Sequence, residues 1–135
     1  MKEPGYRLNV GLIIANENGE LLLCKRKKMN SWQFPQGGID FGESPIKAAK
    51  RELFEEVGIS SKSVTLIESL DDWLKYEIPK KSRRKNFLDR KFKGQKQKWF
   101  LFKLNKNVKV TFENDPDNEF DDFKWVSYWL SLIHI

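Results

Sequence analysis

The 135-residue sequence contains one cysteine and one histidine, and this scarcity excludes several kinds of site. Cys24 cannot form a disulfide within the chain, so a reducing compartment is the simplest location and we expect the protein in the cytoplasm. One cysteine and His134 cannot supply the thiolate and imidazole ligands of a structural zinc site. Catalysis by a histidine base would depend on a residue next to the C-terminus, and we discount it.

Long hydrophobic runs are also missing. Residues 10–15 form the most apolar early run, which is far too short to cross a bilayer, and the first five residues lack the apolar core of a signal peptide. We therefore expect no membrane contact. The length suits one compact domain, and 33% charged with 13% aromatic residues is compatible with a folded core. We expect residues 1–135 to form a single α/β domain and a monomer.

Charge is distributed unevenly along the chain. The net charge is +6, but residues 75–98 hold eleven Lys and Arg against only Glu77 and Asp89, so this window carries +9 and the remainder −3. The sequence therefore predicts a basic patch on a slightly acidic body.

Apolar and β-branched runs that end in turn residues predict a mainly β chain with one strong helix, and hence a mixed sheet with helix cover. The expected strands are residues 6–15, 21–24, 64–70, 73–78, 99–104 and 108–112, with a last apolar segment at 123–126. For residues 73–78 a helix is the alternative. Asn18-Gly19 predicts a hairpin turn that pairs the second strand with the first. Residues 36–42 and 80–93 are expected to be loops, and the second of these is strongly basic.

The helix is expected between Ser44-Pro45 and Gly58. The Ser44 hydroxyl can cap a free backbone N–H, and proline at the first helical position loses no needed donor. Glycine provides the left-handed C-terminal cap. An apolar stripe recurs at helical spacing and comprises Ile46, Ala49, Leu53 and Val57.

The same helix places Glu52, Glu55 and Glu56 on one face beside this stripe. Three adjacent carboxylates repel one another, and the simplest interpretation is a solvated acidic surface. The functional alternative is that a divalent cation neutralises them. Carboxylate ligands without histidine or cysteine indicate a hard ion, Mg²⁺ or Mn²⁺.

A wider spacing favours the functional alternative. The sequence follows the pattern G-x5-E-x7-R-E-U-x-E-E-x-G-U, where U is a bulky aliphatic residue, at Gly37, Glu43, Arg51, Glu52, Leu53, Glu55, Glu56, Gly58 and Ile59. This pattern is the Nudix box, and the chain resembles the Nudix hydrolases. The resemblance implies the Nudix fold with a catalytic loop-helix-loop at about residues 37–59, which binds more than one divalent ion, Mg²⁺ or Mn²⁺, and hydrolyses a phosphoanhydride.

The resemblance also implies roles for the box residues. Glu52, Glu55 and Glu56 are expected to be metal ligands, with Glu52 and Glu56 catalytic, and the backbone at Gly37 is expected to contribute a carbonyl. Arg51 is expected to orient a glutamate, and Glu55 four residues later is an easy partner. Glu43 is expected to act in the outer shell or as a weaker ligand.

Segments outside the box are similar to a narrower group, the bacterial RNA pyrophosphohydrolases, which convert the 5′-triphosphate end of RNA to a monophosphate and so start RNA decay. These segments are residues 5–7, 9–11, 31–39, 73–74, 79–80, 94–101, 119–121 and 125–129. The resemblance implies that Glu119 reaches the metal site as a ligand or helps to activate water. Residues expected to face the 5′ phosphates and first nucleotides are Arg7, Arg26, Tyr76, Gln95 and Lys98. The basic window would then neutralise the RNA backbone.

Three other expectations accompany this interpretation. Relatives continue into a long C-terminal helix after the segment at 125–129. We expect either that this chain is truncated or that the helix is absent, and both leave apolar sheet surface without its usual cover. The substrate could instead be a dinucleoside oligophosphate of the Ap4A or Ap5A type. An inactive RNA-binding module is the alternative from another class, and the intact set of Glu52, Glu55, Glu56 and Glu119 argues against it.

Overall fold

The structure is a computed structural model that describes residues 5–70, 72–77 and 94–127. Strands make up most of its regular secondary structure, together with one α-helix and one short 3-10 helix. In chain order the elements are β1 (Tyr6–Ala15), β2 (Leu21–Arg26), β3 (Trp32–Gln33), β4 (Gln36–Gly38), α1 (Pro45–Val57), η1 (Ser61–Ser63), β5 (Val64–Ser69), β6 (Leu74–Glu77), β7 (Gly94–Leu104) and β8 (Phe120–Val126). The expected basic loop at 80–93 and the chain end after residue 127 lie outside the described residues.

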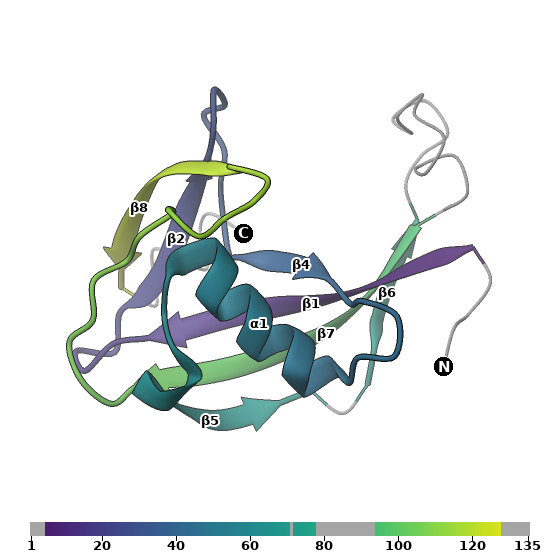
Figure 1. Ribbon diagram of the computed structural model, residues 1–135, viewed down its shortest axis with the longest axis horizontal. Coiled ribbons are helices and arrows are strands. Elements are labelled where there is room, and N and C mark those ends of the chain that lie inside the picture. The colour runs from purple at the N-terminus through teal and green to yellow at the C-terminus, as the bar shows by residue number, and fades with distance from the viewer. Residues whose placement is uncertain (1–4, 71, 78–93, 128–135) are drawn as a thin grey trace.

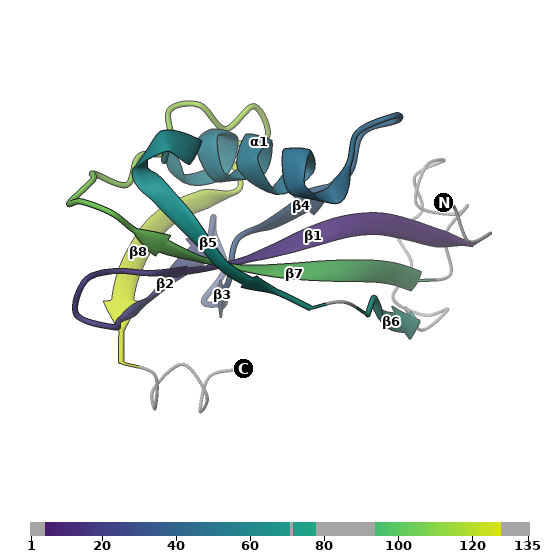
Figure 2. The same cartoon turned by 90° about the horizontal axis from the view of Figure 1, so that it is seen from below.

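The strands form one mixed sheet in the order β3-β2-β1-β7-β5, with β4 paired to β1, β6 to β7 and β8 to β2. The central pair, β1 and β7, is parallel and in register over its whole length, from Tyr6 opposite Gly94 to Ala15 opposite Lys103. All other pairs are antiparallel. Helix α1 lies across one face of this sheet (Figures 1 and 2). The expected mixed sheet with helix cover is therefore confirmed.

Helix α1 begins and ends where the sequence predicts. The Ser44 side chain accepts the Lys47 backbone N–H at 3.3 Å, and proline follows as the first helical residue. At the other end Gly58 has φ 72°, and its N–H donates to the Phe54 carbonyl at 2.9 Å. A Cβ on Gly58 would also overlap the Thr111 side chain, so this position needs glycine for two reasons.

The core lies between α1 and the middle of the sheet. The predicted stripe supplies Ala49, Leu53 and Val57, which are fully buried. Alternate residues of β1 and β7 face them, and these are Val10, Leu12, Ile14, Phe100, Phe102 and Leu104. On the opposite face the Trp99 ring occupies the space where a Cβ on Gly11 would lie. Among the described residues, no helix is long and apolar enough to cross a membrane.

Two predicted segments differ from the structure. Residues 108–112 are not a strand, although Val110 is buried as the apolar alternation predicts. This segment is held by the end of α1 instead of by a neighbouring strand, because the Thr111 N–H donates to the Val57 carbonyl at 3.0 Å. Conversely, Gln36–Gly38 was expected to be loop and forms strand β4, which pairs with β1.

The structure also differs from the prediction at the hairpin and at the start of β7. Strand β2 pairs with β1 only at Ala15 opposite Leu21, and most of its length pairs with β8. Strand β7 begins at Gly94, five residues before the expected start, because it pairs with β1 along its full length.

Candidate active site

Strand β4 brings Gly37 directly against α1. A Cβ on Gly37 would overlap the Glu52 carboxylate, so only glycine permits this approach. Successive residues of a strand face opposite sides, and a Cβ on the next residue, Gly38, would lie 3.0 Å from an Arg7 guanidinium nitrogen. Strand β4 therefore has the Glu52 carboxylate on one side and the Arg7 guanidinium on the other.

Two of the three helix carboxylates are almost fully buried. The exposed fraction is 6% for Glu52 and 3% for Glu56, and the Oε2 atom of each has no hydrogen-bond partner. Burial, followed by the charges of Glu119 and Asp115, raises the pKa of Glu56 to about 10. Burial also raises the pKa of Glu52, although the hydrogen bond from Arg51 opposes that shift. Because Glu52 and Glu56 are almost fully buried, which is costly for carboxylates, the chain does not form a solvated acidic surface here.

Arg51 connects the box residues. Its Nε and Nη2 atoms donate to the two oxygens of Glu43 at 2.8 and 2.9 Å, a bidentate pair that lowers the pKa of Glu43. Its Nη1 donates to Glu52 at 2.8 Å and to Glu55 at 3.0 Å, and Nη2 also donates to the Gly38 carbonyl at 2.8 Å. The expected pairing with Glu55 is present, and the stronger partner is Glu43. One guanidinium thus holds three carboxylates and strand β4 in fixed relation.

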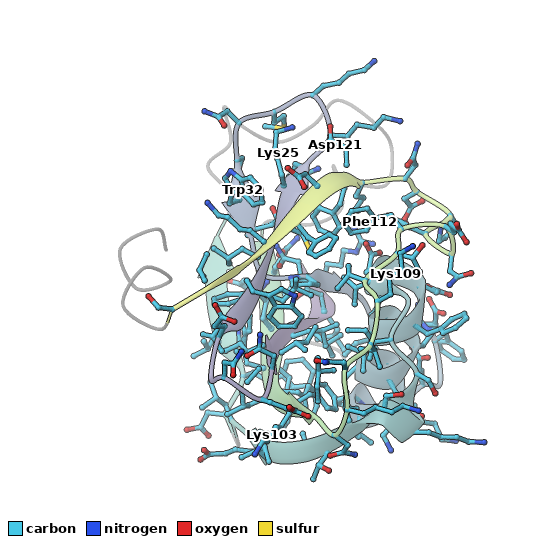
Figure 3. All side chains as sticks on the ribbon, turned by 90° about the vertical axis from the view of Figure 1, so that its left-hand side faces the viewer. Lys25, Trp32, Lys103, Lys109, Phe112 and Asp121 are labelled. Atoms are coloured by element: carbon cyan, nitrogen blue, oxygen red, sulfur yellow. The ribbon has the colours of Figure 1, made fainter. Side chains whose placement is uncertain are left out.

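Glu119 lies immediately before β8, at the edge of this cluster. Burial raises its pKa, as does the Asp115 charge, while Arg26 and Arg7 lower it, so both arginines lie close enough to act on it. Its carbonyl accepts the Lys27 N–H at 2.7 Å. The adjoining ends of β2 and β8 are also joined by Lys25 and Asp121 at 3.0 Å, and Figure 3 shows these two side chains side by side.

The residues expected to face the substrate divide into two groups. Arg7 lies opposite Gln95 in the β1–β7 register, and Gln95 lies opposite Tyr76 in the β6–β7 register, so the three form one row across the sheet. The side chain of Tyr76 lies outside the part that the structure describes. Lys98 does not join this row. It lies opposite Val10, on the face that α1 covers, with its amine 5.8 Å from the centre of the Trp73 ring.

Two features of the site were not predicted from the sequence. The Gln97 amide donates to Gln36 at 2.6 Å and to Gln95 at 3.4 Å, which makes a row of amides on the face opposite α1. Strand alternation in Gln-Lys-Gln-Lys at 95–98 is the signal that predicts amides on one face and lysines on the other. The second feature is Asp115, which accepts hydrogen bonds from the backbone of the turn that ends at Glu119. In the sequence, the only indication of this role is that Asp115 begins a short segment rich in acidic and turn-forming residues.

The residues fit a hard divalent ion, although they do not enclose one as they stand. Among the described residues, no three His, Cys, Asp or Glu side chains are arranged to hold a metal ion. The donor set is nevertheless carboxylate only, and the buried Oε2 atoms of Glu52 and Glu56 are acceptors without donors. Such atoms are suited to Mg²⁺ or Mn²⁺ and not to zinc.

Comparison with known proteins places the chain in a family. Residues 5–131 match the NUDIX domain. A protein from Proteus mirabilis (strain HI4320) named RNA pyrophosphohydrolase is 48% identical over 130 residues, which are 94% of this chain and 72% of that protein. One of the same name from Vibrio vulnificus (strain YJ016) is 49% identical over 128 residues, or 93% and 73% of the two chains. The solved structure of a C. elegans Ap4A hydrolase binary complex is 26% identical and superposes with a TM-score of 0.71, covering 95% of this chain and 85% of that one. The chain therefore belongs to the Nudix family.

Proposed function

We propose that this protein is a divalent-ion-dependent hydrolase that removes pyrophosphate, or successive phosphates, from the 5′-triphosphate end of RNA, and that it acts in the cytoplasm. The observation that carries the reaction is the pair of buried carboxylates, Glu52 and Glu56, whose Oε2 atoms have no hydrogen-bond donor, with Glu52 lying against Gly37 of strand β4. The choice of RNA is supported by the identity to proteins named RNA pyrophosphohydrolase across nearly the whole chain.

The metal site would be formed by this chain's own carboxylates. Glu52 and Glu56 would hold the ions together with Glu55, Glu119 and the Gly37 carbonyl. Bound ions would polarise the phosphate oxygens, stabilise the charge that builds in the transition state and acidify the attacking water.

The surrounding residues would orient the metal ligands and neutralise the charge of the polyphosphate. Arg51 holds the carboxylates of Glu52 and Glu55 through hydrogen bonds of 2.8 and 3.0 Å, so these ligands need little reorganisation. Arg7 and Arg26 would contact the polyphosphate, since a guanidinium fork matches phosphate geometry. Glu119, whose pKa burial raises, is suited to accept a proton from water.

A strip of lysines and aromatic rings supports a polymeric substrate. The amines of Lys96 and Lys98 lie 5.5 and 5.8 Å from the Trp73 ring centre, and the Lys75 amine lies 4.8 Å from that of Tyr6. We call these five residues the lysine strip. Lysines beside aromatic rings suit the backbone and bases of a single strand. Lys75 lies directly opposite Lys96, an arrangement that an anionic partner would stabilise.

The test is release of phosphate or pyrophosphate from triphosphorylated RNA with Mg²⁺ or Mn²⁺. We expect Glu52→Gln to lower the rate on the order of 10²–10⁴-fold. Glu68→Gln on the exposed strand β5 should leave it unchanged. If RNA is untouched and Ap4A is cleaved rapidly, the substrate is wrong and the reaction class survives. If calorimetry detects no binding of either ion, the inactive module becomes the better interpretation.

A further inference from the structure

Asp115 lies in the segment that joins β7 to β8 and is 8% exposed. Its Oδ1 accepts the backbone N–H of Asp117 at 2.9 Å, and its Oδ2 accepts the backbone N–H of Glu119 at 2.8 Å. Both oxygens of one buried carboxylate are thus used to shape a five-residue turn. Bonds from N–H groups to a charged acceptor are stronger than neutral ones, so the turn is held firmly.

The turn fixes Glu119 from two sides. Asp115 holds the N–H of Glu119, and Lys27 donates to its carbonyl at 2.7 Å. Asn118, directly before Glu119, has φ 51°, a backbone conformation that asparagine tolerates better than most residues. The peptide units on both sides of Glu119 are therefore anchored, which sets the direction in which its side chain leaves the backbone.

The fixed direction matters because of what lies nearby. The charge of Glu119 acts on Glu56, and Glu56 is 97% buried with an oxygen that has no partner. Both oxygens of the Asp115 carboxylate accept backbone N–H bonds within the turn, and its charge, like that of Glu119, helps to raise the pKa of Glu56.

We propose that Asp115 is a positioning residue for phosphoanhydride hydrolysis, which sets the direction of the Glu119 side chain through the backbone of the 115–119 turn. This inference rests on the proposed function, because Glu119 must take part in the reaction for its placement to matter. It adds a residue outside the Nudix box to the machinery of this chain.

The experiment is a double-mutant cycle on triphosphorylated RNA with Asp115→Ala, Glu119→Gln and the double variant. Asp115→Ala should lower kcat about 10–100-fold, as loss of a residue that orients a ligand does, with KM for RNA within about twofold of the parent's. In the Glu119→Gln background the same substitution should have no further effect on kcat. Full additivity of the two losses would overturn the proposal.

Two further variants separate positioning from folding. Asp115→Asn retains one acceptor oxygen, so its kcat should lie between that of Asp115→Ala and that of the unsubstituted protein. It replaces Asp115→Ala in the experiment if that variant does not fold. Glu113→Ala, an exposed acid of the same segment, should leave kcat unchanged. A folded Asp115→Asn with the rate of Asp115→Ala, or a folded Asp115→Ala with the parent's kcat, contradicts the proposal. If the unsubstituted protein cleaves only Ap4A, the assignment of RNA as the substrate is refuted. The same double-mutant cycle on Ap4A would then still test the positioning role of Asp115. A parent without any hydrolysis would refute both.

Discussion

The two ends of the sheet handle charge in opposite ways. Under α1, one guanidinium holds three carboxylates, and the buried Glu52 and Glu56 each have an oxygen without a hydrogen-bond partner. At the other end, where β1, β6 and β7 extend past α1 (Figure 2), the lysines of the lysine strip rest on aromatic rings near the surface. Burial makes the acidic end dependent on a few short hydrogen bonds and on compensating positive charge. The lysine strip keeps its charge in water and is suited to loose, additive contacts with an anion.

The largest effect should follow from removing Arg51. Arg51→Ala leaves three carboxylates without their cation, and we expect a loss of about 2–3 kcal/mol in the free energy of unfolding, below the value for a fully buried pair because the Arg51 side chain is 26% exposed. Urea denaturation without divalent ions measures this. Arg51→Lys should recover only part of the loss, since an ammonium group cannot reproduce the bidentate pair with Glu43. A loss no greater than that of Lys50→Ala, an exposed neighbour, would contradict the picture of the acidic end.

The next effect concerns pH. Glu56 has its pKa raised from 4.5 to about 10, so its contribution to stability is complete below pH 4.5 and is lost as the pH rises toward 10. The metal-free protein should therefore unfold at a lower temperature at pH 9 than at pH 6, by about 10 °C. Burial also raises the pKa values of Glu52 and Glu119, which act in the same direction.

Glu56→Gln should reduce this decline, because an amide does not ionise, and calorimetric scans in a chelator measure it. Mg²⁺ or Mn²⁺ should raise the unfolding temperature of the parent more at pH 9 than at pH 6, since the ion binds the deprotonated carboxylates. Glu68→Gln is the matched control. An equally steep decline in Glu56→Gln would show that the buried pair does not govern the pH dependence.

The smallest effect is expected at the lysine strip. The Lys96→Ala, Lys98→Ala double variant should raise KM for a long triphosphorylated RNA about 3–10-fold with kcat unchanged. It should also lower the salt dependence by about 0.7 in log–log slope for each phosphate that the variant no longer neutralises. A triphosphorylated dinucleotide should show no change. Lys103→Ala, at the far end of β7, is the control. Equal effects on the long and short substrates would place these lysines at the 5′ phosphates instead.

Local signals predicted the catalytic helix well. Its caps, Ser44 and Gly58, act through bonds within a few residues, so the sequence alone carries them. The Arg51–Glu55 bond is local in the same sense. The stronger pair with Glu43 depends on how the chain returns from β4 to α1, and spacing along a helix does not report that.

Predictions failed where a distant contact decides the structure. Residues 108–112 alternate like a strand, but the end of α1 takes the N–H of Thr111. Lys98 and Gln95 are close in sequence, and strand alternation places them on opposite faces of β7. The two hydrogen bonds that Asp115 accepts from the backbone exist only once the turn is formed, so no local pattern predicts them.

The parallel pairing of β1 with β7 has a consequence for synthesis. Every residue of β1 pairs with one that is made 88 positions later, from Tyr6 with Gly94 to Ala15 with Lys103. Strand β1 therefore leaves the ribosome long before its main partner exists, and until then only β2 and β4 can cover part of it. The middle of the sheet cannot close until β7 has been made, and until then the nascent chain carries an apolar strand with an open edge.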